Sequence, residues 1–227
     1  MLTCNNLKLN ANHMNKFCFL VMLAWAVMSC NPSKTTVNVH INGGPLSQKV
    51  SLMTKDSTYS MSLDSTGTAL FTLAENLKPG YATLAYGRMQ VPVYVEPRNS
   101  FDVSITIEGR NVDTKFAGEG AKKNEYLNSK TLRRYFPDFK ADEVAFLGGI
   151  ITQEDQLVAM LDSMNFDESF KQMEKKRIHY MLYSMLANYP SYHSYYTQNR
   201  GFKPSENFYN EMKAAIQEEE ALLDMKE

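Results

Sequence analysis

The stretch Phe116-Ala-Gly-Glu-Gly-Ala-Lys-Lys-Asn-Glu-Tyr-Leu-Asn128 divides the chain into two kinds of sequence. Before it, short runs of alternating apolar and polar residues are typical of strands. After it, most segments repeat their apolar residues with helical spacing. Gly118 and Gly120 lie at the boundary, where they favour a break in regular structure. We therefore predict an α+β fold, with a β domain over residues 36–117 and a helical region over residues 118–227.

Composition excludes several classes of protein. The chain has 227 residues, with 24 basic and 25 acidic side chains and a formal net charge of -1, so it lacks the excess of positive charge typical of nucleic-acid-binding proteins. Its three cysteines are Cys4, Cys18 and Cys30. Because no cysteine occurs from Asn31 onward, that part of the chain cannot form an internal disulfide, a thiolate metal site or a cysteine nucleophile.

The N-terminus has the parts of a secretory signal. A short basic start at Met14-Asn-Lys is followed by twelve apolar residues, 17–28, and then by Ser29-Cys-Asn-Pro32. Twelve residues are too few to cross a bilayer as a helix, which needs roughly 20. We predict a signal peptide over residues 1–29, with translation starting at Met14.

The end of the signal resembles a bacterial lipobox. In Val27-Met-Ser-Cys30, cleavage would fall between Ser29 and Cys30, and Cys30 would be acylated, for example with palmitate. Cleavage would leave 22 basic and 25 acidic residues, a net charge of -3. The alternative is a buried helix in which Cys30 is incidental, although a packed helix is rarely apolar on every face. We expect a protein anchored to a membrane of the cell envelope, facing the periplasm or in the outer membrane, with residues 30–35 as a tether.

Seven short strands are predicted in the β domain. Val37, Val39 and Ile41 alternate with polar residues, and residues 101–108 show the same period of two. Pro92 suggests that its strand lies at the edge of a sheet. The spacing favours an antiparallel sandwich or an open barrel. The strands are expected near residues 36–41, 50–54, 59–63, 69–73, 81–86, 90–95 and 101–108.

About four helices are predicted after the glycines. The first covers residues 121–136 and ends before Pro137. The second begins at a capping box, Thr152-Gln-Glu-Asp155, and continues to about residue 164. The third covers about residues 167–188, where Tyr189-Pro190 ends it. Ser205 is expected to cap the last helix, whose apolar residues include Phe208, Met212, Ala215, Ile216, Leu222 and Leu223.

A concentration of tyrosines is the main candidate for a binding surface. Tyrosine offers rigid amphipathic contact area, but it also packs at helix ends, and both interpretations stay open. His179 and His193 lie near these tyrosines but have no carboxylate cluster nearby in the sequence, so we predict no metal site and no cofactor. No nucleophile or hydrolase motif is present, so no catalytic residue is predicted. The candidate face consists of Tyr180, Tyr183, Tyr189, Tyr192, Tyr195 and Tyr196.

Four stretches carry a resemblance to a known family. They are Lys115-Phe-Ala-Gly-Glu-Gly-Ala-Lys-Lys-Asn-Glu-Tyr-Leu127, Glu174-Lys-Lys-Arg-Ile-His-Tyr180, Asn188-Tyr-Pro-Ser-Tyr-His193 and Pro204-Ser-Glu-Asn-Phe-Tyr209. Together with the lipobox and the short strands, they resemble the N-terminal region of Bacteroidetes envelope lipoproteins of the thioredoxin-like, TlpA-type family. That region is a DUF4369-like β domain followed by a helical segment.

The resemblance implies two functions between which the residues do not decide. In the family, a thioredoxin domain with a Cys-x-x-Cys site comes next, and it would be expected after Glu227. This sequence has no such cysteine pair, so no redox residue can be assigned and the chain should not exchange disulfides by itself. The first hypothesis is a lipid-anchored, non-catalytic binding module. The alternative is the truncated or split N-terminal part of an envelope thiol–disulfide oxidoreductase, with a separate thioredoxin-like protein as its partner.

Overall fold

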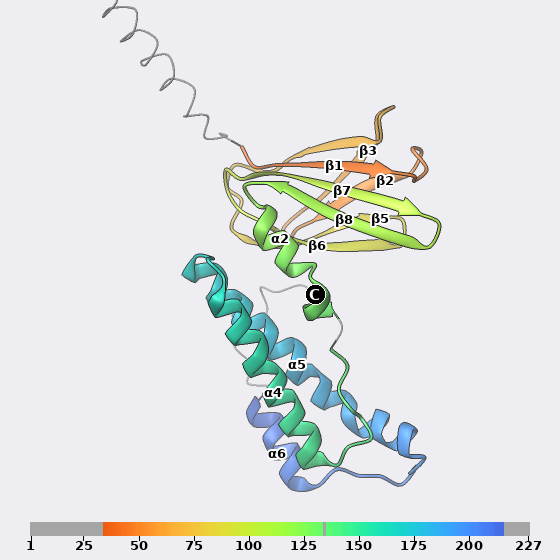
Figure 1. Cartoon of the computed structure of the whole chain (residues 1–227), viewed down its shortest axis with the longest axis vertical. Coiled ribbons are helices and arrows are strands. Elements are labelled where there is room, and N and C mark those ends of the chain that lie inside the picture. Colours follow the sequence, from red (N-terminus) through yellow and green to blue (C-terminus); the bar gives the residue numbers. More distant parts are fainter. Residues whose placement is uncertain (1–33, 134, 216–227) are drawn as a thin grey trace, which may run out of the picture.

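The computed structural model describes residues 34–133 and 135–215 (Figure 1). In these residues an N-terminal β-sandwich is followed by helices, which confirms the predicted α+β fold. The sandwich lies at one end of the long axis and the helical body at the other, with α2 (Ala121–Leu127) between them (Figure 1).

The described strands form two sheets of four. The first has the order β4–β1–β7–β8, with β4 at Thr68–Thr72, β1 at Thr36–Asn42, β7 at Ser100–Glu108 and β8 at Asn111–Gly118. The second has the order β3–β2–β5–β6, with β3 at Thr58–Ser62, β2 at Lys49–Met53, β5 at Gly80–Tyr86 and β6 at Met89–Val95. Five of the six pairings are antiparallel, and β1 and β7 run parallel.

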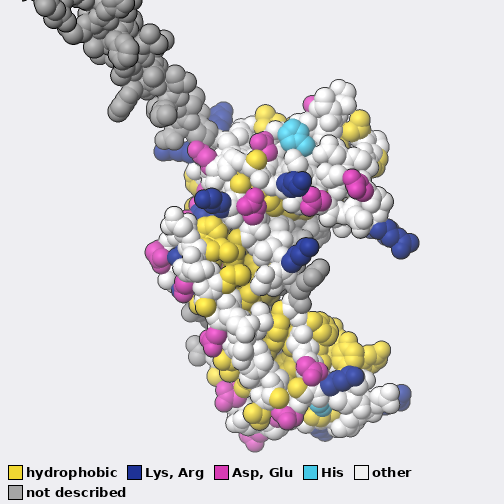
Figure 2. Space-filling model, in the orientation of Figure 1, with side chains coloured by type: hydrophobic (Ala, Val, Ile, Leu, Met, Phe, Trp, Pro, Cys, Tyr) yellow, Lys and Arg dark blue, Asp and Glu magenta, His cyan; other side chains and the backbone are white. Residues whose placement is uncertain are grey.

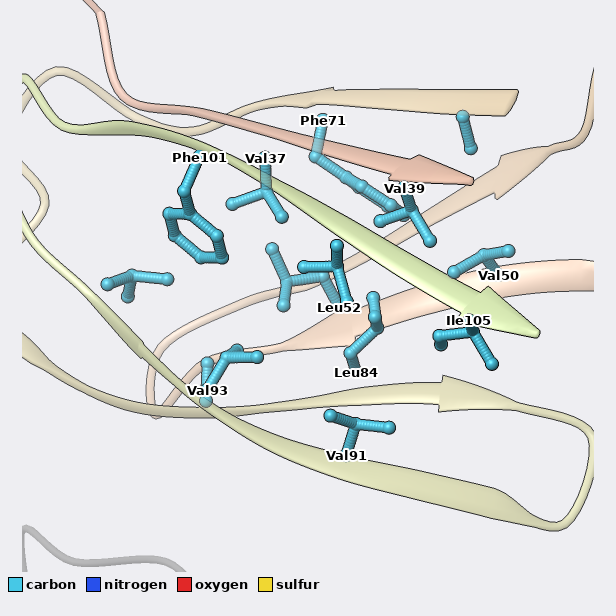
Figure 3. Close-up of a cluster of buried hydrophobic side chains, with 14 of the residues drawn as sticks. Val37, Val39, Val50, Leu52, Phe71, Leu84, Val91, Val93, Phe101 and Ile105 are labelled. Atoms are coloured by element: carbon cyan, nitrogen blue, oxygen red, sulfur yellow. The ribbon is translucent and has the colours of Figure 1, made fainter. Parts of the chain in front are cut away.

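The core of the sandwich lies between the two sheets (Figure 3). Buried and less buried side chains alternate along β1, β2, β4, β5 and most of β7, so the period-2 pattern that predicts these strands also fills this core. As predicted from Pro92, β6 is an edge strand. The buried residues labelled in Figure 3 are Val37, Val39, Val50, Leu52, Phe71, Leu84, Val91, Val93, Phe101 and Ile105.

The eighth strand was absent from the prediction. β8 pairs with β7 as a hairpin around Gly109, and Phe116 is its only buried residue. Because its other side chains are exposed or half-buried, β8 has no alternating apolar pattern to detect. Its backbone ladder with β7 holds it in place.

The predicted break between the strands and the helices is confirmed, and it occurs at Gly118. Its φ is +93°, and a Cβ atom there would lie 2.6 Å from the carbonyl oxygen of Ser100. Only glycine tolerates both conditions. The Glu119 N–H then donates to the Ser100 carbonyl at 3.0 Å, and α2 begins two residues later.

The first predicted helix is two short helices, so the prediction of one helix over residues 121–136 is wrong. α2 ends at Leu127, and the single turn α3 (Lys130–Arg133) follows. The cause is Asn128, whose side-chain amide donates to the Asn124 carbonyl and to the Pro92 carbonyl on β6, both at 2.8 Å. A contact with the sheet therefore ends the helix.

The second helix begins nine residues earlier than predicted. α4 (Glu143–Ser163) starts at Asp142, whose carboxylate accepts a hydrogen bond from the Ala145 N–H at 2.8 Å. Thr152 lies inside the helix, and its hydroxyl donates to the Gly148 carbonyl. The capping-box prediction at Thr152 is therefore wrong. Gly148 and Gly149 are exposed on α4 and do not end it.

The third helix continues past its predicted end. α5 (Glu168–Thr197) begins after Asp167 as predicted, but it passes through Pro190. The ring of Tyr189 is fully buried 4.3 Å from that of Phe146, and its hydroxyl donates to the Ala141 carbonyl at 2.8 Å. A proline in an exposed helix costs about 3 kcal/mol. The packing of Tyr189 in the helical body outweighs that cost.

The last described helix confirms its predicted start. α6 (Glu206–Ala215) is capped by the Ser205 hydroxyl, which accepts from the Phe208 N–H at 3.1 Å. Phe208 is buried against Tyr189. The apolar residues predicted to continue this helix, Ile216, Leu222 and Leu223, lie outside the described residues.

A second core lies between the helices. α4 and α5 pack side by side, and their buried residues follow helical spacing: Phe146, Ile150, Leu157 and Leu161 on α4, and Phe170, Ile178, Leu182, Leu186 and Tyr189 on α5. In Figure 2, apolar side chains gather over the helical half, and charged side chains are scattered over both halves.

By length and composition, α4 alone among the described helices could cross a membrane. Its middle turn carries Gln153, Glu154 and Asp155, and Glu154 bonds to His179 of α5 at 2.8 Å. An acidic residue at the centre of a bilayer costs roughly 3 kcal/mol. These polar residues and the four buried ones identify α4 as a core helix of the helical body.

Candidate functional site

The predicted site residues fall into two groups. Ser29 and Cys30, the predicted cleavage and lipidation sites, lie outside the described residues, as does the signal peptide over residues 1–29. The tyrosines all lie on α5. Thr35, expected as the last residue of the tether, is buried, and its hydroxyl donates to the Glu96 carbonyl at 2.9 Å.

The six tyrosines do not form one surface. Tyr183 and Tyr189 are buried, and burial raises the pKa of each hydroxyl to about 12. Tyr180 is half-buried beside His179. The exposed members are Tyr192, Tyr195 and Tyr196, in the last two turns of α5. Packing therefore accounts for part of the tyrosine concentration, and an exposed aromatic end of the helix accounts for the rest.

The junction of the sandwich and the helical body is built on the open edge of β6. Asn124 of α2 is fully buried, and its side-chain amide bonds to both backbone groups of Tyr94, at 2.6 Å to the N–H and 3.2 Å to the carbonyl. The side-chain amide of Asn128, one turn later, donates a hydrogen bond to the Pro92 carbonyl. Two asparagines thus satisfy the edge that another strand would otherwise pair with.

Lys123 fastens the start of α5 to the same edge. Its ammonium group lies 2.6 Å from the Glu96 carboxylate and 2.5 Å from the Asp167 carboxylate. It also lies over the rings of Tyr94 and Phe170, which meet edge to face at 4.8 Å. The hydrogen bond from Lys123 holds the pKa of Asp167 below its ordinary value. The end of β6, α2 and the start of α5 are therefore held together at one point.

A buried ion pair forms the third contact of the junction. Glu174 of α5 is fully buried, and the guanidinium group of Arg177, three residues later, donates hydrogen bonds to both carboxylate oxygens, at 2.8 and 2.5 Å. The Tyr81 hydroxyl of β5 donates to the same carboxylate at 2.6 Å. Burial and the negative charge of Glu174 raise the pKa of Tyr81 well above its ordinary value, so this hydroxyl stays protonated. The charge of Glu174 is thus compensated within the junction.

A cleft of about 430 Å³ opens beside these contacts, between the sandwich and α5. One wall consists of the β2–β3 turn and the β4–β5 loop, and the other is the first half of α5. Residues far apart in the sequence thus meet in one hollow. The lining residues are Thr54, Lys55, Asp56, Leu77, Lys78, Pro79, Gly80, Tyr81, Val95, Gln172, Met173 and Lys176.

A second hollow, of about 620 Å³, lies at the far end of the helical body near Tyr189 and Phe202. It is wide open, and several of its polar groups already bond within the protein. Glu143 accepts from the Ser205 backbone at 2.7 Å, and His193 lies 2.9 Å from the Phe139 carbonyl. The junction cleft is the better candidate because it is the more enclosed of the two.

The cleft has the chemistry of a binding site. Its lining combines three lysines and one aspartate with apolar side chains, and it includes no histidine, cysteine or serine. Among the described residues no three histidine, cysteine, aspartate or glutamate side chains group to hold a metal. Sequence reasoning missed the cleft because Lys55, Lys78 and Lys176 come from three separate segments. The one local signal is Glu174 and Arg177, which lie three residues apart on one helix face.

Comparison of the sequence with models of protein families and with curated proteins finds no match.

Proposed function

We propose that this protein is a lipid-anchored binding module of the cell envelope, which takes a small ligand in the junction cleft and has no catalytic role of its own. The anchor is Cys30, exposed as the first residue when the signal over residues 1–29 is removed. The resemblance to the N-terminal region of TlpA-type lipoproteins supports the same location.

The observation that carries the binding role is the construction of the cleft from both halves of the molecule. A ligand there would touch the sandwich through residues such as Leu77 and Lys78, and α5 through Gln172 and Met173. The volume of about 430 Å³ lies within the range of ligand pockets, roughly 300 to 1,000 Å³. A lining that combines apolar side chains with a few polar or charged ones is the usual composition of such pockets.

The anchor is tested by detergent phase separation of the protein made in a bacterial host. The wild type should enter the detergent phase, and Cys30→Ala should remain in the aqueous phase because its acyl chains are missing. Cys18→Ala is the matched control, since Cys18 leaves with the signal peptide. Equal partitioning of wild type and Cys30→Ala would contradict lipidation at Cys30.

The binding role is tested by ligand-observed NMR with a set of small molecules balanced in anionic, neutral and cationic members. Some should bind the wild type and fail to bind Gln172→Trp, whose indole would fill the cleft. Gln156→Trp is the control, because Gln156 is exposed on α4 and does not line the cleft. If no compound of any charge distinguishes the two variants, the cleft is not a ligand site.

An accessory role in thiol–disulfide exchange is the second candidate, and the resemblance favours it. The stretches of residues 115–127 and 174–180 that carry the resemblance contribute Lys123, Asn124 and Glu174 to the junction. A separate thioredoxin-like protein would then be the partner. The candidate predicts that the mature chain alone reduces insulin with dithiothreitol no faster than buffer, and that it accelerates a thioredoxin-like partner when the two are mixed.

A further inference from the structure

We propose that β8 is a docking surface for a second copy of this chain. The β8 strand of the second copy would pair with it antiparallel and join two sheets of four strands into one sheet of eight. The open edge of β8, the direction of its backbone groups and the order of its charges support such a dimer. No residue of β8 lines the junction cleft, so the dimer is independent of the proposed binding role.

β8 has the open edge that the addition of a strand requires. Among the described strands it pairs only with β7. The edge of β6, in contrast, is covered by α2, and β3 and β4 contact each other. α2 also contacts β8, but the β7–β8 hairpin, where β8 begins, points away from α2 (Figure 1). Four of the five residues 111–115 are exposed, so this part of the edge is accessible.

Alternate residues of β8 direct their backbone groups to the open edge. In an antiparallel ladder, hydrogen-bonded pairs come at every second residue. The Glu119 N–H donates to the Ser100 carbonyl at 3.0 Å, one step beyond the last pair of the β7–β8 ladder. By alternation, the N–H and C=O groups of Val112, Thr114 and Phe116 point away from β7. These groups can form a ladder with another strand.

The order of the charges on β8 fits a second copy of the same strand. Two copies related by a two-fold axis at Thr114 would place Asp113 of each copy opposite Lys115 of the other. Both of these pairs would occupy non-hydrogen-bonded positions, where facing side chains are closest. Opposite charges that face each other across two strands stabilise a sheet, and like charges destabilise it. β8 is therefore complementary to itself.

The charges also select the register of the two strands. An axis at Asp113 would set two aspartates opposite each other, and an axis at Lys115 would do the same with two lysines. Within one chain these two side chains already lie 3.6 Å apart, and they are 66% and 79% exposed. An exposed pair of this kind contributes little, and its exposure leaves both charges accessible to a second copy. The axis at Thr114 is therefore the favoured one.

The dimer is tested by sedimentation velocity on residues 30–227, made without the signal and with Cys30→Ser, so that the chain has neither acyl group nor thiol. We expect an equilibrium of monomer and dimer. Asp113→Lys and Lys115→Asp should each weaken the dimer about tenfold or more, because two opposite-charge pairs become like-charge pairs. The double variant should recover the wild-type affinity. Lys49→Asp, an exposed charge reversal on β2, is the control and should leave the affinity unchanged.

The register is tested by cross-linking through introduced cysteines in the same Cys30→Ser chain. In the dimer, the Cα atoms of residue 113 and of residue 115 in the other copy would lie about 4.5 Å apart, which a disulfide can span. The two copies of residue 113 would lie about 7 to 8 Å apart, which is too far. On oxidation with diamide, a mixture of Asp113→Cys and Lys115→Cys chains should cross-link, and either variant alone should not.

Four results would overturn the proposal. A chain that stays monomeric up to about 1 mM forms no such dimer, and its β8 edge would be left for a strand of another protein. A dimer that survives both single charge reversals unchanged uses a different surface. A double variant as weak as the single ones would mean that the facing charges do not pair. Cross-linking of Asp113→Cys with itself as fast as with Lys115→Cys would exclude the axis at Thr114.

Discussion

The sandwich and the helical body differ in what fixes the ends of their elements. In the sandwich, the seven predicted strands all form, because most of them alternate between the core and the outside and a shift of one residue would reverse every side chain. In the helical body, three of the predicted helix ends are wrong. The start of α4 is a local cap at Asp142, whereas the end of α2 and the passage of α5 through Pro190 depend on distant contacts. Local pattern specifies a half-buried strand, whereas tertiary contacts decide where α2 ends and whether α5 stops at its proline.

The largest loss of stability is expected for Glu174→Gln, which removes the carboxylate charge at the junction of the two halves. Arg177 would keep a partly buried charge without its carboxylate partner, which costs about 3 to 5 kcal/mol. Urea denaturation should show that loss, or separate unfolding of the two halves. Glu125→Gln, an exposed change on α2, is the control and should be nearly neutral. A cost below about 1 kcal/mol for Glu174→Gln would mean that the halves are not coupled through this pair.

Asn124→Leu tests the protected edge of β6. The leucine would leave the N–H and carbonyl of Tyr94 buried without partners, at an expected cost of about 2 to 3 kcal/mol. The free energy of unfolding from urea titration measures it. Asn111→Leu, an exposed asparagine at the start of β8, should change stability much less. Equal effects would show that α2 does not stabilise the edge.

Two prolines compare the halves directly. Pro190→Ala should stabilise the protein by about 1 kcal/mol, because α5 regains a backbone hydrogen bond inside a helix that already exists. Pro92→Ala should change stability by less than about 0.5 kcal/mol, because Pro92 occupies an edge strand that tolerates it. Thermal unfolding of both variants provides the measurement. A destabilised Pro190→Ala would mean that α5 requires the proline.

The smallest effect concerns the pH dependence of the Asp167–Lys123 contact. Lys123 lowers the folded-state pKa of Asp167 below its ordinary value of 3.8. The contact therefore adds stability above that pH and loses it as the pH falls through the folded-state pKa. Asp167→Asn, which keeps a capping side chain, should lower the urea midpoint at pH 7 and have little effect below about pH 3. Asp142→Asn, at the other aspartate cap, is the comparison; a constant difference for Asp167→Asn at both pH values would contradict the contact.

Much of the fold follows from the sequence, but the candidate site does not. The break at Gly118, the start of α5 near Asp167, the cap at Ser205 and the edge position of Pro92 were all predicted from the sequence. β8 was missed because its stability comes from pairing and not from an apolar pattern. The passage of α5 through Pro190 was missed because the burial of Tyr189 depends on α4.

The cleft could not be found from sequence spacing. Lys55 and Lys176 are 121 positions apart, and only the packing of α5 against the sandwich brings both to one hollow. The tyrosines, in contrast, were conspicuous in the sequence but are divided between the core and the surface. Composition along one segment therefore indicates which residues are unusual, and the fold decides which of them can meet a ligand.

The most direct test of the account is the unfolding temperature of the mature protein with and without each compound of the charge-balanced set, measured for wild type, Gln172→Trp and Gln156→Trp. A ligand that binds the folded state raises the unfolding temperature in proportion to its occupancy. We expect the tightest-binding compound to raise it for the wild type and for Gln156→Trp, and to leave Gln172→Trp unchanged. An equal rise in all three proteins, or no rise in any of them with any compound of the set, would contradict a ligand site at the junction of the sandwich and the helical body.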